Sequence, residues 1–144
     1  PMEAVMSKRV FVAYSNRDLP RVEILVSELE SRGLDVWFAP RELSGEVDPE
    51  RTMAKIRDAI ASSDTFLYCD SIAARNRLNG GFLSAETGEA EKRSLIDPAF
   101  SLVTVSIDAG VGQPLSVGSR IVVDLPREGW SDGVGNLTRS LEDG

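Results

Sequence analysis

The chain of 144 residues contains no histidine and only one cysteine. Without histidine, the protein cannot use a serine–histidine pair, histidine metal ligands or a histidine pH switch. With Cys69 alone, it can form neither an internal disulfide nor a cysteine-cluster zinc site, and we expect no bound metal. Any enzymatic chemistry must therefore depend on carboxylates, hydroxyls, lysine, arginine or a borrowed cofactor.

Positive charge and long apolar runs are also scarce. The chain has 16 basic and 23 acidic residues and a net charge of −7, whereas a nucleic-acid-binding domain needs a basic surface. No apolar run approaches the roughly 18 residues that span a membrane, and the first residues do not resemble a secretory signal. These features predict a cytoplasmic domain that binds neither nucleic acid nor a membrane.

The residues that are present indicate one ordinary globular unit. Hydrophobic residues make up 42% of the chain and charged residues 27%, a balance typical of folded domains rather than disordered segments. The length is sufficient for one hydrophobic core. We expect a single domain over residues 1–144, with its core at about 8–142 and a flexible or added segment at 1–7.

Short apolar segments alternate with amphipathic segments along the sequence. We predict strands at residues 9–14, 34–38, 65–69, 101–107 and 121–125. We predict helices at residues 19–33, 49–62, 82–92 and 134–141, and Asp18 and Asp48 as the N-caps of the first two. This alternation predicts an α/β, flavodoxin-like fold of three layers, with a five-stranded, mainly parallel sheet and helices on both faces.

Ligands of such folds bind in the crevice outside the carboxyl ends of the strands. Three predicted loops lie there: Ser15–Asp18, Ala39–Val47 and Asp70–Gly81. The functional residues are therefore expected in or next to these loops. Trp37 and Cys69, which lie at strand ends, are expected to be buried packing residues instead.

Four segments in order resemble motifs of the Toll/interleukin-1 receptor (TIR) domain, particularly the bacterial kind. Val10–Asp18 is similar to the first motif of the family, and Gly33–Phe38 is similar to its second strand. Arg41–Gly45 resembles the loop that follows in bacterial members, and Ala59–Asp64 resembles the helix end before the third strand. The resemblance extends over about residues 8 to 93.

In TIR domains that cleave NAD⁺, the catalytic glutamate follows an aromatic residue by four positions. Phe82 and Glu86 have this spacing, although the family usually has tryptophan at the position of Phe82. The resemblance implies that Glu86 is the catalytic residue of an NAD⁺ glycohydrolase or ADP-ribosyl cyclase, with NAD⁺ as substrate and no other cofactor. From the pattern alone, Glu86 would be assigned to surface charge near a helix start.

The chemistry suits a chain without histidine. Glycoside hydrolysis normally needs an acid that protonates the leaving group. The nicotinamide of NAD⁺ is already a cation and leaves as a neutral amide, so one carboxylate that stabilises the ribosyl cation is sufficient.

Seven further residues are candidates for substrate binding because of their places near the expected crevice. They are Tyr14, Ser15, Arg17, Phe38, Arg41, Ser71 and Phe82. Aromatic rings would stack on nicotinamide, arginines would pair with the pyrophosphate, and serines would offer hydroxyl or backbone contacts. Core packing, solvated charge and loop capping are the alternative roles for the same residue types.

The resemblance implies an effector of a bacterial antiphage defence system that is activated by assembly and fused to, or partnered with, a sensor domain. The alternative is a non-catalytic adaptor that self-associates through the Ala39–Val47 loop. The presence of Glu86 at the catalytic spacing favours the enzyme. A receiver domain of the same fold is a third possibility, but Tyr14 and Ser15 replace the paired acids that it would have after the first strand.

Overall fold

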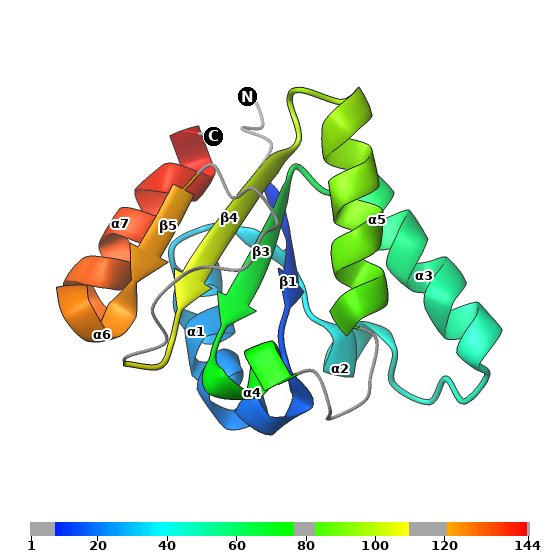
Figure 1. Ribbon diagram of the computed structural model, residues 1–144, viewed down its shortest axis with the longest axis horizontal. Helices are drawn as coiled ribbons and strands as arrows, with labels where there is room; N and C mark the ends of the chain where they lie inside the picture. Colours follow the sequence, from blue (N-terminus) through cyan, green and yellow to red (C-terminus); the bar gives the residue numbers. More distant parts are fainter. Residues whose placement is uncertain (1–7, 77–82, 110–120, 144) are drawn as a thin grey trace.

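The computed structural model describes residues 8–76, 83–109 and 121–143 (Figure 1). Five strands form one sheet in the order β2-β1-β3-β4-β5, and every neighbouring pair is parallel. The strands are β1 (Arg9–Ala13), β2 (Asp35–Trp37), β3 (Thr65–Asp70), β4 (Ser101–Ser106) and β5 (Ile121–Asp124). This is the flavodoxin-like order, and the predicted fold class is confirmed.

In the described ranges, four long helices and four short ones connect or follow the strands. The long helices are α1 (Leu19–Ser31), α3 (Pro49–Ala61), α5 (Leu83–Ile96) and α7 (Trp130–Asp143). The short ones are the 3₁₀ helix η1 (Asn16–Asp18), α2 (Ala39–Glu42), α4 (Ile72–Asn76) and α6 (Leu125–Glu128). In the described part of the chain, every helix is too short or too polar to cross a membrane.

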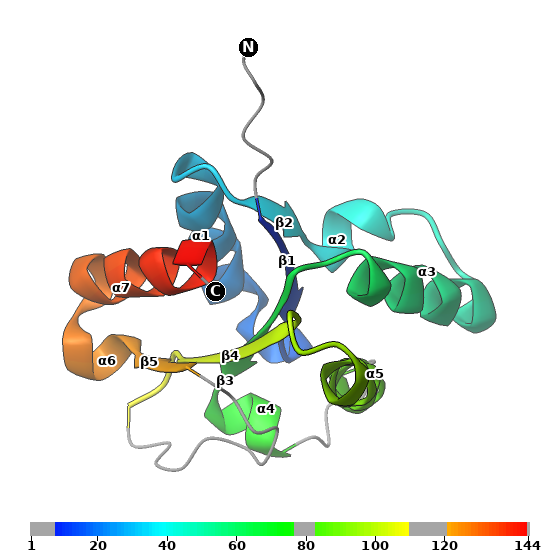
Figure 2. The same cartoon turned by 90° about the horizontal axis from the view of Figure 1, so that it is seen from above.

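The sheet separates two hydrophobic clusters, with α1 and α7 on one face and α3 and α5 on the other (Figure 2). Val10 and Val12 belong to the cluster on the α1–α7 face, whereas Phe11 and Ala13 belong to the α3–α5 cluster. Alternate residues of a strand point to opposite faces. Since both faces are covered, all six residues of β3 are buried.

Two helix boundaries differ from the prediction by four residues, and the others by at most two. Helix α5 continues to Ile96, and α7 begins at Trp130 rather than at residue 134. Glycines normally weaken a helix, but Gly133 lies inside α7 because α6 passes close to it. A side-chain carbon at Gly133 would lie 2.6 Å from a methyl carbon of Leu125, so the glycine permits this packing.

The two predicted N-caps have different outcomes. The Asp48 carboxylate accepts a hydrogen bond from the Glu50 amide at 3.0 Å, so it caps α3 as predicted. Asp18 also occupies the N-cap position of α1, as predicted, but its side chain makes no capping hydrogen bond. The Asp18 carboxylate instead accepts hydrogen bonds from the side chains of Arg21, in the first turn of α1, and of Ser71, after β3.

Candidate active site

Glu86 lies in the first turn of α5, and α5 begins near the end of the sheet to which β1 and β3 point (Figure 1). The helix turns it inward with Leu83 and Ala90, and the Glu86 residue is only 8% exposed. Among the described residues, no basic side chain forms an ion pair with it. Burial raises the pKa of Glu86 to about 8, because the charged form is poorly solvated there. The carboxyl group is therefore mainly protonated at neutral pH.

Tyr14 follows β1 and is half-buried. Its ring is tilted against that of Phe38, with centroids 5.7 Å apart. Burial, and then the negative charge of Glu86, raise the pKa of Tyr14 to about 12. The ring contact places Tyr14 and Phe38 together at the carboxyl ends of β1 and β2.

Ser15 is next to Tyr14 and is 6% exposed. Within the described part of the chain, its buried hydroxyl oxygen has no hydrogen-bond partner. Buried polar groups nearly always have a partner. The Ser15 hydroxyl therefore has unused hydrogen-bonding capacity among the described residues.

The two candidate arginines differ in their surroundings. The Arg41 guanidinium lies over the Phe38 ring at 5.6 Å and forms an ion pair with Glu30 at 2.8 Å. It is therefore next to the aromatic pair but already has an acidic partner. Arg17 is exposed on η1. Phe82 lies outside the described residues.

Ser71 begins the segment after β3, and its hydroxyl both donates and accepts a hydrogen bond. It donates to the Asp18 carboxylate at 2.5 Å and accepts from the Ala74 amide at 2.9 Å. The structure thus gives Ser71 a role in joining two loops. Its contact with a substrate stays a prediction.

A set of four residues, which we call the three-loop clamp, ties together the segments after β1, β3 and β4. Its members are Asp18, Arg21, Ser71 and Asp108. Arg21 donates to Asp18 at 2.6 Å and to Asp108 at 2.5 Å, and Asp108 accepts from the Ile72 amide at 2.9 Å. The sequence indicates only a helix cap at Asp18, because its partner Ser71 is 53 residues away.

Asp70 and Cys69 end β3, and both are fully buried. Arg75 donates two hydrogen bonds to the Asp70 carboxylate, at 3.0 and 2.7 Å. Burial raises the pKa of the Cys69 thiol far above its ordinary value, so the cysteine is inert, as predicted. No cluster of potential metal ligands occurs among the residues that the structure describes.

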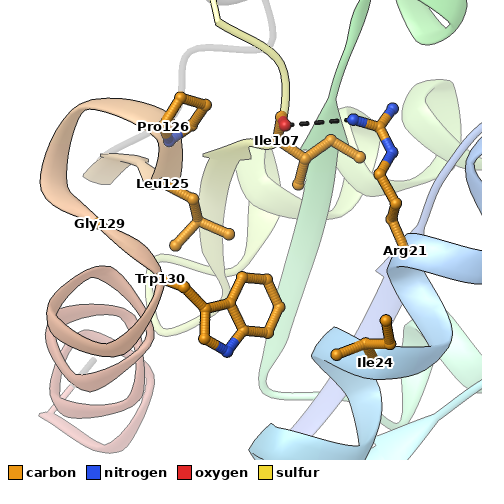
Figure 3. A pocket seen from close by; sticks show the side chains of 7 residues that line it. All are labelled: Arg21, Ile24, Ile107, Leu125, Pro126, Gly129 and Trp130. Atoms are coloured by element: carbon orange, nitrogen blue, oxygen red, sulfur yellow. Dashed lines mark hydrogen bonds between the residues drawn. The ribbon is translucent and has the colours of Figure 1, made fainter.

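A groove of about 500 Å³ lies between α1, the end of β4 and the α6–α7 corner (Figure 3). The Trp130 indole lies on one side of it and Ile24 on the other, and Leu125 and Ile107 also line it. Arg21 lies at its rim and donates to the Ile107 carbonyl at 3.2 Å. The clamp arginine is thus also part of the groove wall.

Solved structures with a similar fold cover most of the chain. The CMP N-glycosidase BcmB of Clostridium botulinum is 18% identical with a TM-score of 0.61, and the match covers 92% of this chain and 99% of that one. The TIR domain of the Toll-related receptor TRR-2 of Hydra magnipapillata is 17% identical with a TM-score of 0.59, over 92% and 96% of the two chains. A prokaryotic SEFIR domain is 14% identical with a TM-score of 0.63, over 94% and 99%.

The sequence comparison gives the family directly. No curated protein matches the chain. A family model described as the TIR domain matches residues 10–138, which is most of the sequence. The match includes Glu86 and, apart from Arg9 and Leu141, the whole sheet and both hydrophobic clusters, and we conclude that the chain belongs to the TIR domain family.

Proposed function

We propose that this TIR domain cleaves the bond between nicotinamide and ribose in NAD⁺, with Glu86 as its catalytic residue. The observation that carries the proposal is a carboxyl group that is 8% exposed and, among the described residues, has no cationic partner. Burying such a group without a partner is unfavourable for folding. A substrate that brings its own positive charge would pair with this carboxylate.

The reaction requires little from the protein. The bond from ribose C1′ to the pyridinium nitrogen breaks, and its electron pair neutralises the nicotinamide that leaves. The Glu86 carboxylate stabilises the positive charge that develops on the ribose. Water adds to C1′ and loses a proton, which gives ADP-ribose; attack by the adenine of the same molecule gives the cyclic product.

Four residues that follow β1 and β2 offer binding groups for the substrate. Tyr14 and Phe38 form an aromatic pair suited to stacking on the nicotinamide ring. The Ser15 hydroxyl is buried and free of partners in the described part of the chain. Arg41 lies over Phe38 and would reach the pyrophosphate by exchanging its pairing with Glu30.

The proposal includes activation by assembly in the cytoplasm, as an effector of bacterial antiphage defence with a fused or partner sensor domain. Self-association would use the Ala39–Val47 loop, where Val47 is 90% exposed. Clusters of exposed apolar side chains are typical of surfaces that contact other proteins. Leu43, in the same loop, is partly buried against the core.

The test is the release of nicotinamide from NAD⁺ by concentrated protein, for wild type and two glutamine variants. We expect Glu86→Gln to lower the rate by about 100-fold or more, as loss of a main electrostatic group does. Glu89→Gln, on the same helix, should retain the wild-type rate. Equal release by wild type and Glu86→Gln, under conditions in which both are assembled, would reject the proposal.

A second candidate is cleavage of the N-glycosidic bond of a pyrimidine nucleotide. The favouring observation is the pKa of Glu86, raised to about 8 by burial, because a neutral base must be protonated as it leaves and a protonated carboxyl can do this. The similar fold of a CMP N-glycosidase supports testing it. Release of cytosine from CMP without release of nicotinamide from NAD⁺ would select this candidate. If assembled protein releases neither base, the adaptor role is favoured.

A further inference from the structure

We propose that Asp18 is a positioning residue for the reaction at Glu86, acting through Ser71. This inference rests on the proposed function. Asp18 lies on the segment that carries Tyr14 and Ser15, and Ser71 lies on the segment that leads from β3 toward α5. The bond between them fixes the two sides of the site relative to each other.

The geometry of Asp18 shows that it is not a surface acid. It is 2% exposed, and its two carboxylate oxygens have different partners: Oδ2 accepts from Ser71 at 2.5 Å and Oδ1 accepts from Arg21 at 2.6 Å. Hydrogen bonds to a charged, buried acceptor are among the stronger ones in proteins. Asp18 therefore holds its loop in one place.

A backbone hydrogen bond links Asp18 directly to Ser15, one of the candidate substrate-binding residues. The Asp18 amide donates to the Ser15 carbonyl at 2.8 Å, which closes the turn just after Tyr14. On the other side, the Ser71 hydroxyl accepts from Ala74 and so fixes the start of α4. If the bond between Asp18 and Ser71 is lost, the free hydroxyl of Ser15 can shift relative to Glu86, and small displacements are costly for catalysis.

The experiment compares Asp18→Asn, Ser71→Ala and the double variant by nicotinamide release. Each single variant should lower kcat by about tenfold or more, with a smaller change in KM. The double variant should be no worse than the poorer single variant, because both remove one interaction. Additive losses in the double variant would overturn a shared positioning role.

Ser63→Ala is the matched control for Ser71→Ala. Ser63 is 1% exposed and donates to the Ala59 carbonyl at 2.6 Å, but it lies before β3 instead of after it. We expect Ser63→Ala to lower the melting temperature while kcat stays at the wild-type value. If the two alanine variants lower kcat equally, Asp18 and Ser71 act on stability alone, and the proposal is wrong.

Hydrogen exchange separates this proposal from the proposed function. Ser71→Ala should accelerate exchange in peptides that contain Tyr14–Asp18 more than Ser63→Ala does, whether or not NAD⁺ is cleaved. If wild type and Glu86→Gln release equal nicotinamide, the proposed function fails, and unchanged exchange would then also overturn the positioning role. Active protein with unchanged exchange overturns the positioning role alone.

Discussion

Asp70, at the carboxyl end of β3, and Glu86, in the first turn of α5, are two buried carboxyl groups with opposite surroundings. Asp70 is 0% exposed and accepts two hydrogen bonds from the guanidinium of Arg75. Glu86 is 8% exposed, and among the described residues it has no cation beside it. Burial alone therefore does not distinguish a structural acid from a functional one.

The difference lies in whether the fold itself supplies the counter-charge. For Asp70 the counter-charge comes from α4, five residues further along the chain. Asp18 is satisfied in the same way by Arg21 and Ser71. Glu86 is left as a buried acid that burial keeps protonated, which is a cost to folding that a cationic substrate would relieve. Replacing Arg75 removes the counter-charge of Asp70, and varying the pH measures the ionisation of Glu86.

Removing the cation from Asp70 should have the largest effect. Arg75→Met keeps much of the side-chain volume but leaves a fully buried carboxylate unpaired, and we expect a loss of about 3 kcal/mol in the free energy of unfolding. Arg32→Met, which removes only the exposed pair with Glu28, should cost roughly 0–0.5 kcal/mol. Urea denaturation measures both. Similar losses in the two variants would show that the Asp70 pair is no different from a surface pair.

The pH dependence of activity measures the ionisation of the buried Glu86 carboxyl group. Cleavage of NAD⁺ needs the carboxylate, and the pKa of Glu86 in the free protein is about 8. We therefore expect kcat/KM to rise roughly tenfold per pH unit below that value and to level off above it. For cleavage of a neutral base the slope would have the opposite sign. A flat profile between pH 6 and 9 would contradict an essential ionisation of Glu86.

Glu86→Gln should make the protein more stable in alkaline solution. Burial raises the pKa from 4.5 to about 8, so between these values the folded state holds a proton that the unfolded state has lost. Stability then falls as the pH rises through this range, by at most about 1.4 kcal/mol per pH unit. We expect the gain of glutamine over wild type to grow with pH, to reach at most about 4 kcal/mol at pH 8, and to be absent at pH 4. An equal difference at both pH values would show that Glu86 does not titrate in this range.

The sequence was sufficient for the sheet, because its strands are continuous apolar segments and its helices carry clear apolar faces. It also located Glu86, through the four-residue spacing of a family motif, although its burial and lack of a cationic partner among the described residues appear only in the fold. Asp18 was assigned to a helix cap, since nothing local indicates a partner 53 residues away. Helix α7 was predicted too short, because Gly133 is explained only by its contact with Leu125.

The smallest expected effect belongs to Glu89, three residues from Glu86 on α5. Its carboxylate is 28% exposed and lies 3.8 Å from Arg57 and 3.5 Å from Lys92, both of which are largely in solvent. Such pairs contribute roughly 0–0.5 kcal/mol and are screened by salt. Glu89→Gln should therefore change the free energy of unfolding by less than that amount, lose even this difference in high salt, and leave nicotinamide release unchanged. If Glu89→Gln also became more stable than wild type as the pH rose, as expected for Glu86→Gln, the burial of Glu86 would not be the cause. The location of both residues on α5 would then account for the stability changes.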